Sequence, residues 1–115
     1  KTENQNIRIT EMWAIINKKD NFNVLHTHPN CYLSAAYYVK APENCGRFQL
    51  ENPNIAKRHF YPEIKVKNEL NTEGAGIDIS EGDLLIFPGY LPHKVGKNES
   101  SKDRIVISFN VDVRK

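Results

Sequence analysis

The chain has 115 residues, of which 26% are charged and 39% apolar, and its formal net charge is +2. This length favours a single folded domain over residues 1–115 with a modest hydrophobic core. The small net charge and the scattered Lys and Arg residues argue against a nucleic-acid partner. No apolar run reaches the roughly 18 residues that a membrane span needs, so the composition also argues against a membrane partner.

Short apolar stretches divided by turn residues fill the first half of the chain. They indicate strands at residues 7–16, 22–28, 32–39 and 47–50. The stretch at 32–39 carries apolar or aromatic residues on both faces, which is typical of a strand that is buried on both sides.

The second half begins with a polar stretch at residues 51–75 that predicts a long loop with one strand at 64–66. A loop of this length in a small domain is a candidate lid over a site. Further strands are expected around 77–79, at 83–87 and at 104–113. With no internal repeat and no helical periodicity, this order predicts an all-β fold, an antiparallel sandwich or barrel of jelly-roll type.

The two cysteines, Cys31 and Cys45, match neither a zinc nor a redox spacing. We expect two free thiols rather than a disulfide, as in an intracellular protein. The expected location is therefore the cytoplasm.

The last predicted strand has two different faces. One carries Arg104, Val106, Ser108 and Asn110, and the other carries Ile105, Ile107, Phe109 and Val111. If the face with the arginine lines a binding cavity, the apolar face lies outside the barrel. Another part of the protein or a partner must then shield this apolar surface from water. The candidates are an outer helical layer that this chain lacks and a second subunit, as in a homodimer.

His26 and His28 stand one residue apart on an extended segment, so their imidazoles are expected on the same side of it. His93 follows a Pro-Gly turn much later in the chain and can close on the pair. Three neutral imidazole nitrogens form a suitable ligand set for a divalent transition metal. We therefore predict a metal site made of these three histidines.

Three segments, in order, resemble the Fe(II)/2-oxoglutarate-dependent dioxygenases: HTHPNCYLSAAYYV, EGDLLIFPGYLPHKV and RIVISFNV. The resemblance is strongest to the prolyl-hydroxylase-like branch and its small 2OG-Fe(II) oxygenases of bacteria and phages, and it runs from about Trp13 to Asn110. It implies a double-stranded β-helix fold, an Fe(II) ion or another divalent metal, and 2-oxoglutarate as cosubstrate. The implied reaction is hydroxylation of an unidentified peptidyl or small-molecule substrate.

Compared position by position, the resemblance assigns His26 and His93 to the two histidines of the family's metal triad. It assigns Arg104 to the arginine that pairs with the far carboxylate of 2-oxoglutarate. Tyr38 matches the tyrosine that hydrogen-bonds the same carboxylate. By strand alternation, Ser34 faces the same way as Tyr38, and Ser108 faces the same way as Arg104. These two serines complete the expected cosubstrate site.

The sequence departs from this family at His28, which stands where the family usually has Asp or Glu. Three histidines leave the metal one charge more positive than a 2-His-1-carboxylate set, which would still allow Fe(II) and would also suit Zn, Ni or Cu. The carboxylates that could substitute from elsewhere are those of Glu43, Asp78 and Asp83. We expect His28 to be the ligand.

Two alternatives remain open from the sequence. Gly82, Pro88-Gly89 and His93 also resemble the second cupin motif, although the glutamate expected soon after His-x-His is missing. A non-catalytic β-barrel that binds a metal or another ligand is the other alternative, and the absent carboxylate is its main support. Metal analysis combined with 2-oxoglutarate turnover would distinguish the oxygenase from the non-catalytic barrel.

Overall fold

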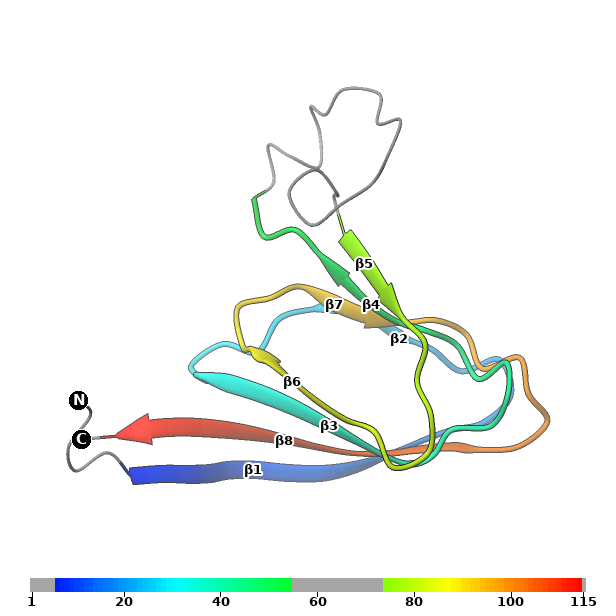
Figure 1. Ribbon diagram of the computed structural model, residues 1–115, viewed down its shortest axis with the longest axis horizontal. Helices are drawn as coiled ribbons and strands as arrows, with labels where there is room; N and C mark the ends of the chain where they lie inside the picture. Colours follow the sequence, from blue (N-terminus) through cyan, green and yellow to red (C-terminus); the bar gives the residue numbers. More distant parts are fainter. Residues whose placement is uncertain (1–5, 55–73, 115) are drawn as a thin grey trace.

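The computed structural model describes residues 6–54 and 74–114, which form two four-stranded antiparallel sheets (Figure 1). The strands are β1 (Asn6–Asn17), β2 (Asn23–His26), β3 (Leu33–Lys40), β4 (Phe48–Glu51), β5 (Gly74–Ile77), β6 (Leu84–Pro88), β7 (His93–Val95) and β8 (Arg104–Arg114). The strand expected at 64–66 and most of the loop expected at 51–75 lie outside the described residues.

The first sheet has the order β1-β8-β3-β6 and the second the order β2-β7-β4-β5. Figure 1 shows the long strands β1 and β8 side by side in one layer, with β2, β7 and β4 in the other. The chain crosses repeatedly between the two sheets, which is the arrangement of a jelly roll. The predicted all-β, double-stranded β-helix fold is thus confirmed. None of the described residues form a helix long and apolar enough to cross a membrane.

A β-bulge in β1 sets which of its side chains face the second sheet. The register against β8 shifts between Ile9 and Glu11, so that Ile9 lies opposite Val111 and Glu11 lies opposite Asn110. Because side chains alternate along a strand, the extra residue brings Glu11 and Trp13 onto the same side as Asn110.

The core lies between the sheets and is small. One buried cluster contains Ala36, Tyr38 and Val106, and a second contains Phe48, Phe87 and Val95. These residues come from the inward faces of β3, β4, β6, β7 and β8. The free thiols expected from the sequence are also present: Cys45 is buried and Cys31 is half-buried.

The outer face of the first sheet is apolar and exposed. Its exposed large side chains include Ile9, Met12, Ile16, Tyr37, Val39, Leu84 and Ile86. The expectation that β3 is buried on both faces was therefore wrong for this chain: Tyr38 is 1% exposed, whereas its neighbour Tyr37 is 41% exposed. The reason is that a strand in a two-layer sandwich is covered by the other sheet on one face alone.

Candidate metal centre and cosubstrate pocket

A cavity of about 340 Å³ lies between the sheets. β1, β3 and β8 contribute to its wall on one side, and β2, β4 and β7 on the other. Six of the seven residues that the sequence predicts for the site line this cavity: His26, His28, Tyr38, His93, Arg104 and Ser108. The exception is Ser34.

The three histidines converge at one point of the cavity wall. His28 Nε2 lies 3.2 Å from His26 Nε2 and 3.1 Å from His93 Nε2. A metal about 2.1 Å from two nitrogens would separate them by about 3.0 Å at a right angle and by about 3.4 Å at a tetrahedral angle. The two observed separations lie between these values, and the possible ligand atoms of all three histidines lie within 4.8 Å of one another, so the three rings could hold a single ion.

The other ring nitrogen of two histidines is held by the backbone. His26 Nδ1 lies 2.6 Å from the Val24 carbonyl oxygen, and His93 Nδ1 lies 2.9 Å from the Leu91 carbonyl oxygen. Because a carbonyl oxygen only accepts, each Nδ1 carries the proton and each Nε2 keeps its lone pair. Both rings are therefore in the tautomer that binds a metal through Nε2.

The Nδ1 atom of His28 is held by a side chain instead of by the backbone. Its Nδ1 lies 3.0 Å from Oδ1 of Asn110, on β8. Its ring also stacks on Trp13, with centroids 6.0 Å apart and planes at 18°. Strand alternation places Asn110 on the same face of β8 as Arg104, but an asparagine there belongs to no distinctive pattern from which a role could be predicted.

Burial keeps the inner histidines neutral. It lowers the pKa of His93 to about 4, against the opposing effect of the hydrogen bond to the Leu91 carbonyl. Burial also lowers the pKa of His28, although its hydrogen bond to Asn110 acts in the opposite direction. A neutral imidazole is the form that coordinates a metal, so the site is ready to bind at neutral pH.

Arg104 is fully buried, yet two of its three guanidinium nitrogens have no partner among the residues that the structure describes. Nη1 donates to the carbonyl oxygens of Cys45 and, at 3.0 Å, Gly96. Nε and Nη2 are buried without a hydrogen-bond partner among the described residues. Burial lowers the pKa of Arg104, but a guanidinium remains charged in proteins. A buried cation with one free edge fits a bidentate carboxylate.

Gly46 allows the loop before β4 to close on this arginine. It has a φ of +95°, and a Cβ atom there would clash with the Gly96 carbonyl and lie 2.8 Å from Nη1 of Arg104. The sequence marked this segment as a loop, and its composition gave no sign that the glycine contacts a site residue.

Tyr38 and the two serines occupy different surroundings. Burial raises the pKa of Tyr38 to about 12, so its hydroxyl keeps its proton beside Arg104 in the cavity wall. Ser108 lines the same cavity. The hydroxyl of Ser34 instead lies 3.4 Å from Asn110 Oδ1 and 3.3 Å from Cys31 Sγ. Ser34 therefore belongs to the surroundings of His28.

The carboxylates considered as substitutes lie elsewhere. Asp78 pairs with Arg47 at 2.8 Å, and an Asp83 carboxylate oxygen accepts the Ser80 amide at 2.8 Å. Within residues 6–54 and 74–114, the one group of three side chains able to hold a metal is His26, His28 and His93.

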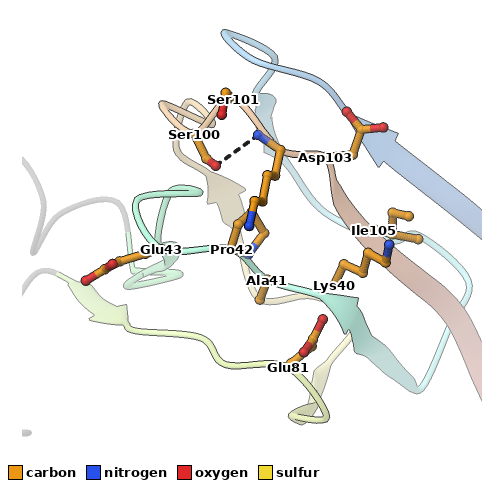
Figure 2. A pocket seen from close by; sticks show the side chains of 10 residues that line it. Lys40, Ala41, Pro42, Glu43, Glu81, Ser100, Ser101, Asp103 and Ile105 are labelled. Atoms are coloured by element: carbon orange, nitrogen blue, oxygen red, sulfur yellow. Dashed lines mark hydrogen bonds between the residues drawn. The ribbon is translucent and has the colours of Figure 1, made fainter.

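Glu43 lines a separate, larger hollow of about 750 Å³. Figure 2 shows Glu43, Glu81 and Asp103 on different sides of it, and the Lys102 amide donates to the Ser100 hydroxyl at 3.0 Å. The lining residues include no histidine, and their charges are mixed. This hollow offers no convergent ligand set.

Comparison with known protein families gives the same family that the three sequence segments resemble. The profile of the family described as "Putative 2OG-Fe(II) oxygenase" matches residues 11–110. No curated protein matches the chain significantly.

Several solved structures share the fold. An oxidoreductase of the 2OG-Fe(II) oxygenase family from Burkholderia pseudomallei has a TM-score of 0.73 at 12% identity, over 95% of this chain and 46% of its own. A prolyl-4-hydroxylase from Pseudomonas putida has a TM-score of 0.62 at 14% identity, over 90% of this chain and 51% of its own. HygX from Streptomyces hygroscopicus with iron bound has a TM-score of 0.61 at 15% identity, over 94% of this chain and 59% of its own.

The chain thus spans about half the length of these similar structures. The family match covers nearly all of it, including the three histidines, Tyr38 and Arg104. The chain belongs to the 2OG-Fe(II) oxygenase family.

Proposed function

We propose that this chain carries the catalytic centre of an Fe(II)/2-oxoglutarate-dependent oxygenase. The observation that carries the proposal is the pairing, in one cavity, of three convergent Nε2 atoms with the unpartnered edge of a buried arginine. His26, His28 and His93 would hold Fe(II). Arg104 would bind the far carboxylate of 2-oxoglutarate in a bidentate way, with Tyr38 and Ser108 beside it.

The donor sets fit both groups. Imidazole nitrogens are good ligands for iron, and three protein ligands would leave room for a chelating keto acid and O2. When bound, Fe(II) and 2-oxoglutarate supply the oxidising chemistry, in which 2-oxoglutarate is converted to succinate and CO2 while a substrate C–H bond is hydroxylated. The protein orients them and keeps water away from His93 with the rings of Phe48 and Phe87.

The cavity is least enclosed near His26, and we propose that the substrate enters there. His26 is exposed, and two exposed apolar side chains of the same part of the chain, Phe22 and Val24, also line the cavity. We propose that a peptidyl or small-molecule substrate approaches here. The similarity to a prolyl-4-hydroxylase is compatible with a peptidyl substrate.

Three further proposals concern the protein outside the site. The exposed apolar face of the first sheet is suited to contact with another protein surface. We propose that a second copy of the chain covers this face in a homodimer. Analytical ultracentrifugation would detect such a dimer. The two free thiols suit a reducing compartment such as the cytoplasm. We also propose that residues 1–115 form a single double-stranded β-helix domain.

The proposal is tested by 2-oxoglutarate turnover. Purified protein loaded anaerobically with Fe(II) and then given O2 and 2-oxoglutarate should form succinate and CO2, even without a second substrate. The His93→Ala variant should form neither. A cupin-type protein or a non-catalytic barrel would bind the metal without consuming 2-oxoglutarate, and that result would reject the oxygenase.

A further inference from the structure

We propose that Asn110 is a positioning residue that fixes His28 in its metal-binding tautomer, and that Glu11 sets the orientation of the Asn110 amide. This inference rests on the proposed function, because it assumes that His28 is a metal ligand. It identifies two residues that the comparison with the family did not assign.

His28 differs from the other two histidines in how its ring is held. His26 and His93 each face a backbone carbonyl two residues earlier, which no side-chain substitution can remove. His28 faces the side chain of Asn110, which is 82 positions away in the sequence. The third ligand therefore depends on a contact between separate parts of the fold.

An asparagine amide can present either end to the histidine, and the two ends have opposite effects. With Oδ1 toward His28, the Nδ1 atom must carry the proton and Nε2 is free to bind the metal. With the NH2 group toward His28, the proton would move to Nε2, which would block coordination. The orientation of the Asn110 amide thus decides whether His28 is a ligand.

Two contacts select the productive orientation. Nδ2 of Asn110 lies 3.3 Å from Oε2 of Glu11, and a carboxylate accepts hydrogen bonds without donating any. The hydroxyl of Ser34 lies 3.4 Å from Oδ1 and can donate to it. Both contacts place the NH2 group away from His28.

The backbone of β1 supports the same arrangement. The bulge after Ile9 brings Glu11 opposite Asn110, and the Thr10 hydroxyl lies 3.5 Å from the Asn110 carbonyl oxygen. The bulge thereby links the Glu11 carboxylate to His28 through two hydrogen bonds, both of which involve the Asn110 amide.

The first test measures the tautomer directly in the metal-free protein. Nitrogen-15 NMR of the imidazoles should show His28 protonated on Nδ1 at neutral pH in the unsubstituted protein. In Asn110→Ala the signals should shift toward a mixture of tautomers, while His26 and His93 should keep theirs. A His28 ring protonated on Nε2 in the unsubstituted protein would overturn the inference.

The second test measures affinity for Co(II), used as an air-stable probe, by calorimetry. Asn110→Ala should bind about 10- to 100-fold more weakly, which is the usual effect of losing a partner of a ligating histidine. Glu11→Lys offers donors alone and should turn the amide, so its loss should be at least as large as that of Asn110→Ala, about 10- to 100-fold. Glu11→Gln keeps an acceptor and should bind nearly as well as the unsubstituted protein.

Glu81→Lys is the matched control, because it makes the same charge change at an exposed turn beside the hollow of Figure 2. Its Co(II) affinity should be unchanged. Equal affinities for the unsubstituted protein, Asn110→Ala and Glu11→Lys would overturn the inference and leave the proposed oxygenase intact. Absence of Co(II) binding by the unsubstituted protein would instead contradict the proposed function, and the tautomer measurement would still decide the role of Asn110.

Discussion

Replacing Arg104 by methionine removes the one buried guanidinium of the cavity while keeping much of its apolar volume. Nε and Nη2 of Arg104 are buried donors that have no partner among the described residues, so a bound carboxylate would gain two charge-assisted hydrogen bonds from them. At about 1.5–3 kcal/mol for each bond, Arg104→Met should cost at least about 3 kcal/mol of binding free energy. This corresponds to 2-oxoglutarate affinity at least roughly 100-fold weaker.

The assay is calorimetric titration of 2-oxoglutarate into anaerobic Fe(II)-loaded protein, with thermal unfolding as a check that each variant folds. Arg104→Lys keeps the charge but not the planar guanidinium. Its affinity for 2-oxoglutarate should therefore lie between those of the unsubstituted protein and Arg104→Met. Arg47→Met is the control, since Arg47 is exposed and pairs with Asp78 at the surface. An Arg104→Met protein that folds and binds 2-oxoglutarate as tightly as the unsubstituted protein would refute the assigned role of Arg104.

Three other predictions concern stability and packing. The metal-free protein should lose stability as the pH falls from 6.5 toward 4, because His93 has a pKa of about 4 when folded against 6.5 when unfolded, so the unfolded chain takes up the proton first. The loss should reach up to about 3 kcal/mol in urea unfolding and should be smaller in His93→Gln; an identical loss in that variant would contradict the assignment. Gly46→Ala should lower both the melting temperature and the 2-oxoglutarate affinity, since the added methyl group meets the Gly96 carbonyl and Arg104; unchanged values of both would show that the loop does not constrain the arginine. Co(II) at about 100 times its Kd should raise the unfolding free energy by about 2.7 kcal/mol, and His28→Ala should show much less of this effect in thermal melts. Equal stabilisation of both proteins would place the metal elsewhere.

The sequence was sufficient to predict most of the strands around the candidate site and the convergence of the histidines. The His-x-His spacing and the Pro-Gly turn before His93 are local features, and strand alternation gives the faces of Tyr38 and Arg104 directly. The three-residue strand β7 was not predicted, because so short a stretch carries no alternation to recognise.

What the sequence could not give was the pairing between strands. Ser34 shares the inward face of β3 with Tyr38, as alternation predicted, but its place along the strand, opposite Asn110, puts it near His28 instead of in the cosubstrate pocket. The contact between Glu11 and Asn110 likewise depends on the bulge in β1. Register and bulges depend on tertiary packing, so residues whose role arises from them can be identified from the structure but not from a single sequence.

The central claim is that three histidines and no carboxylate hold the metal, and a crystal structure of the anaerobic Fe(II)-loaded protein tests it most directly. We predict one ion with Nε2 of His26, His28 and His93 at about 2.0–2.2 Å, and no Asp or Glu oxygen among its ligands. An ion bound without His28, or bound through a carboxylate in its place, would contradict the account.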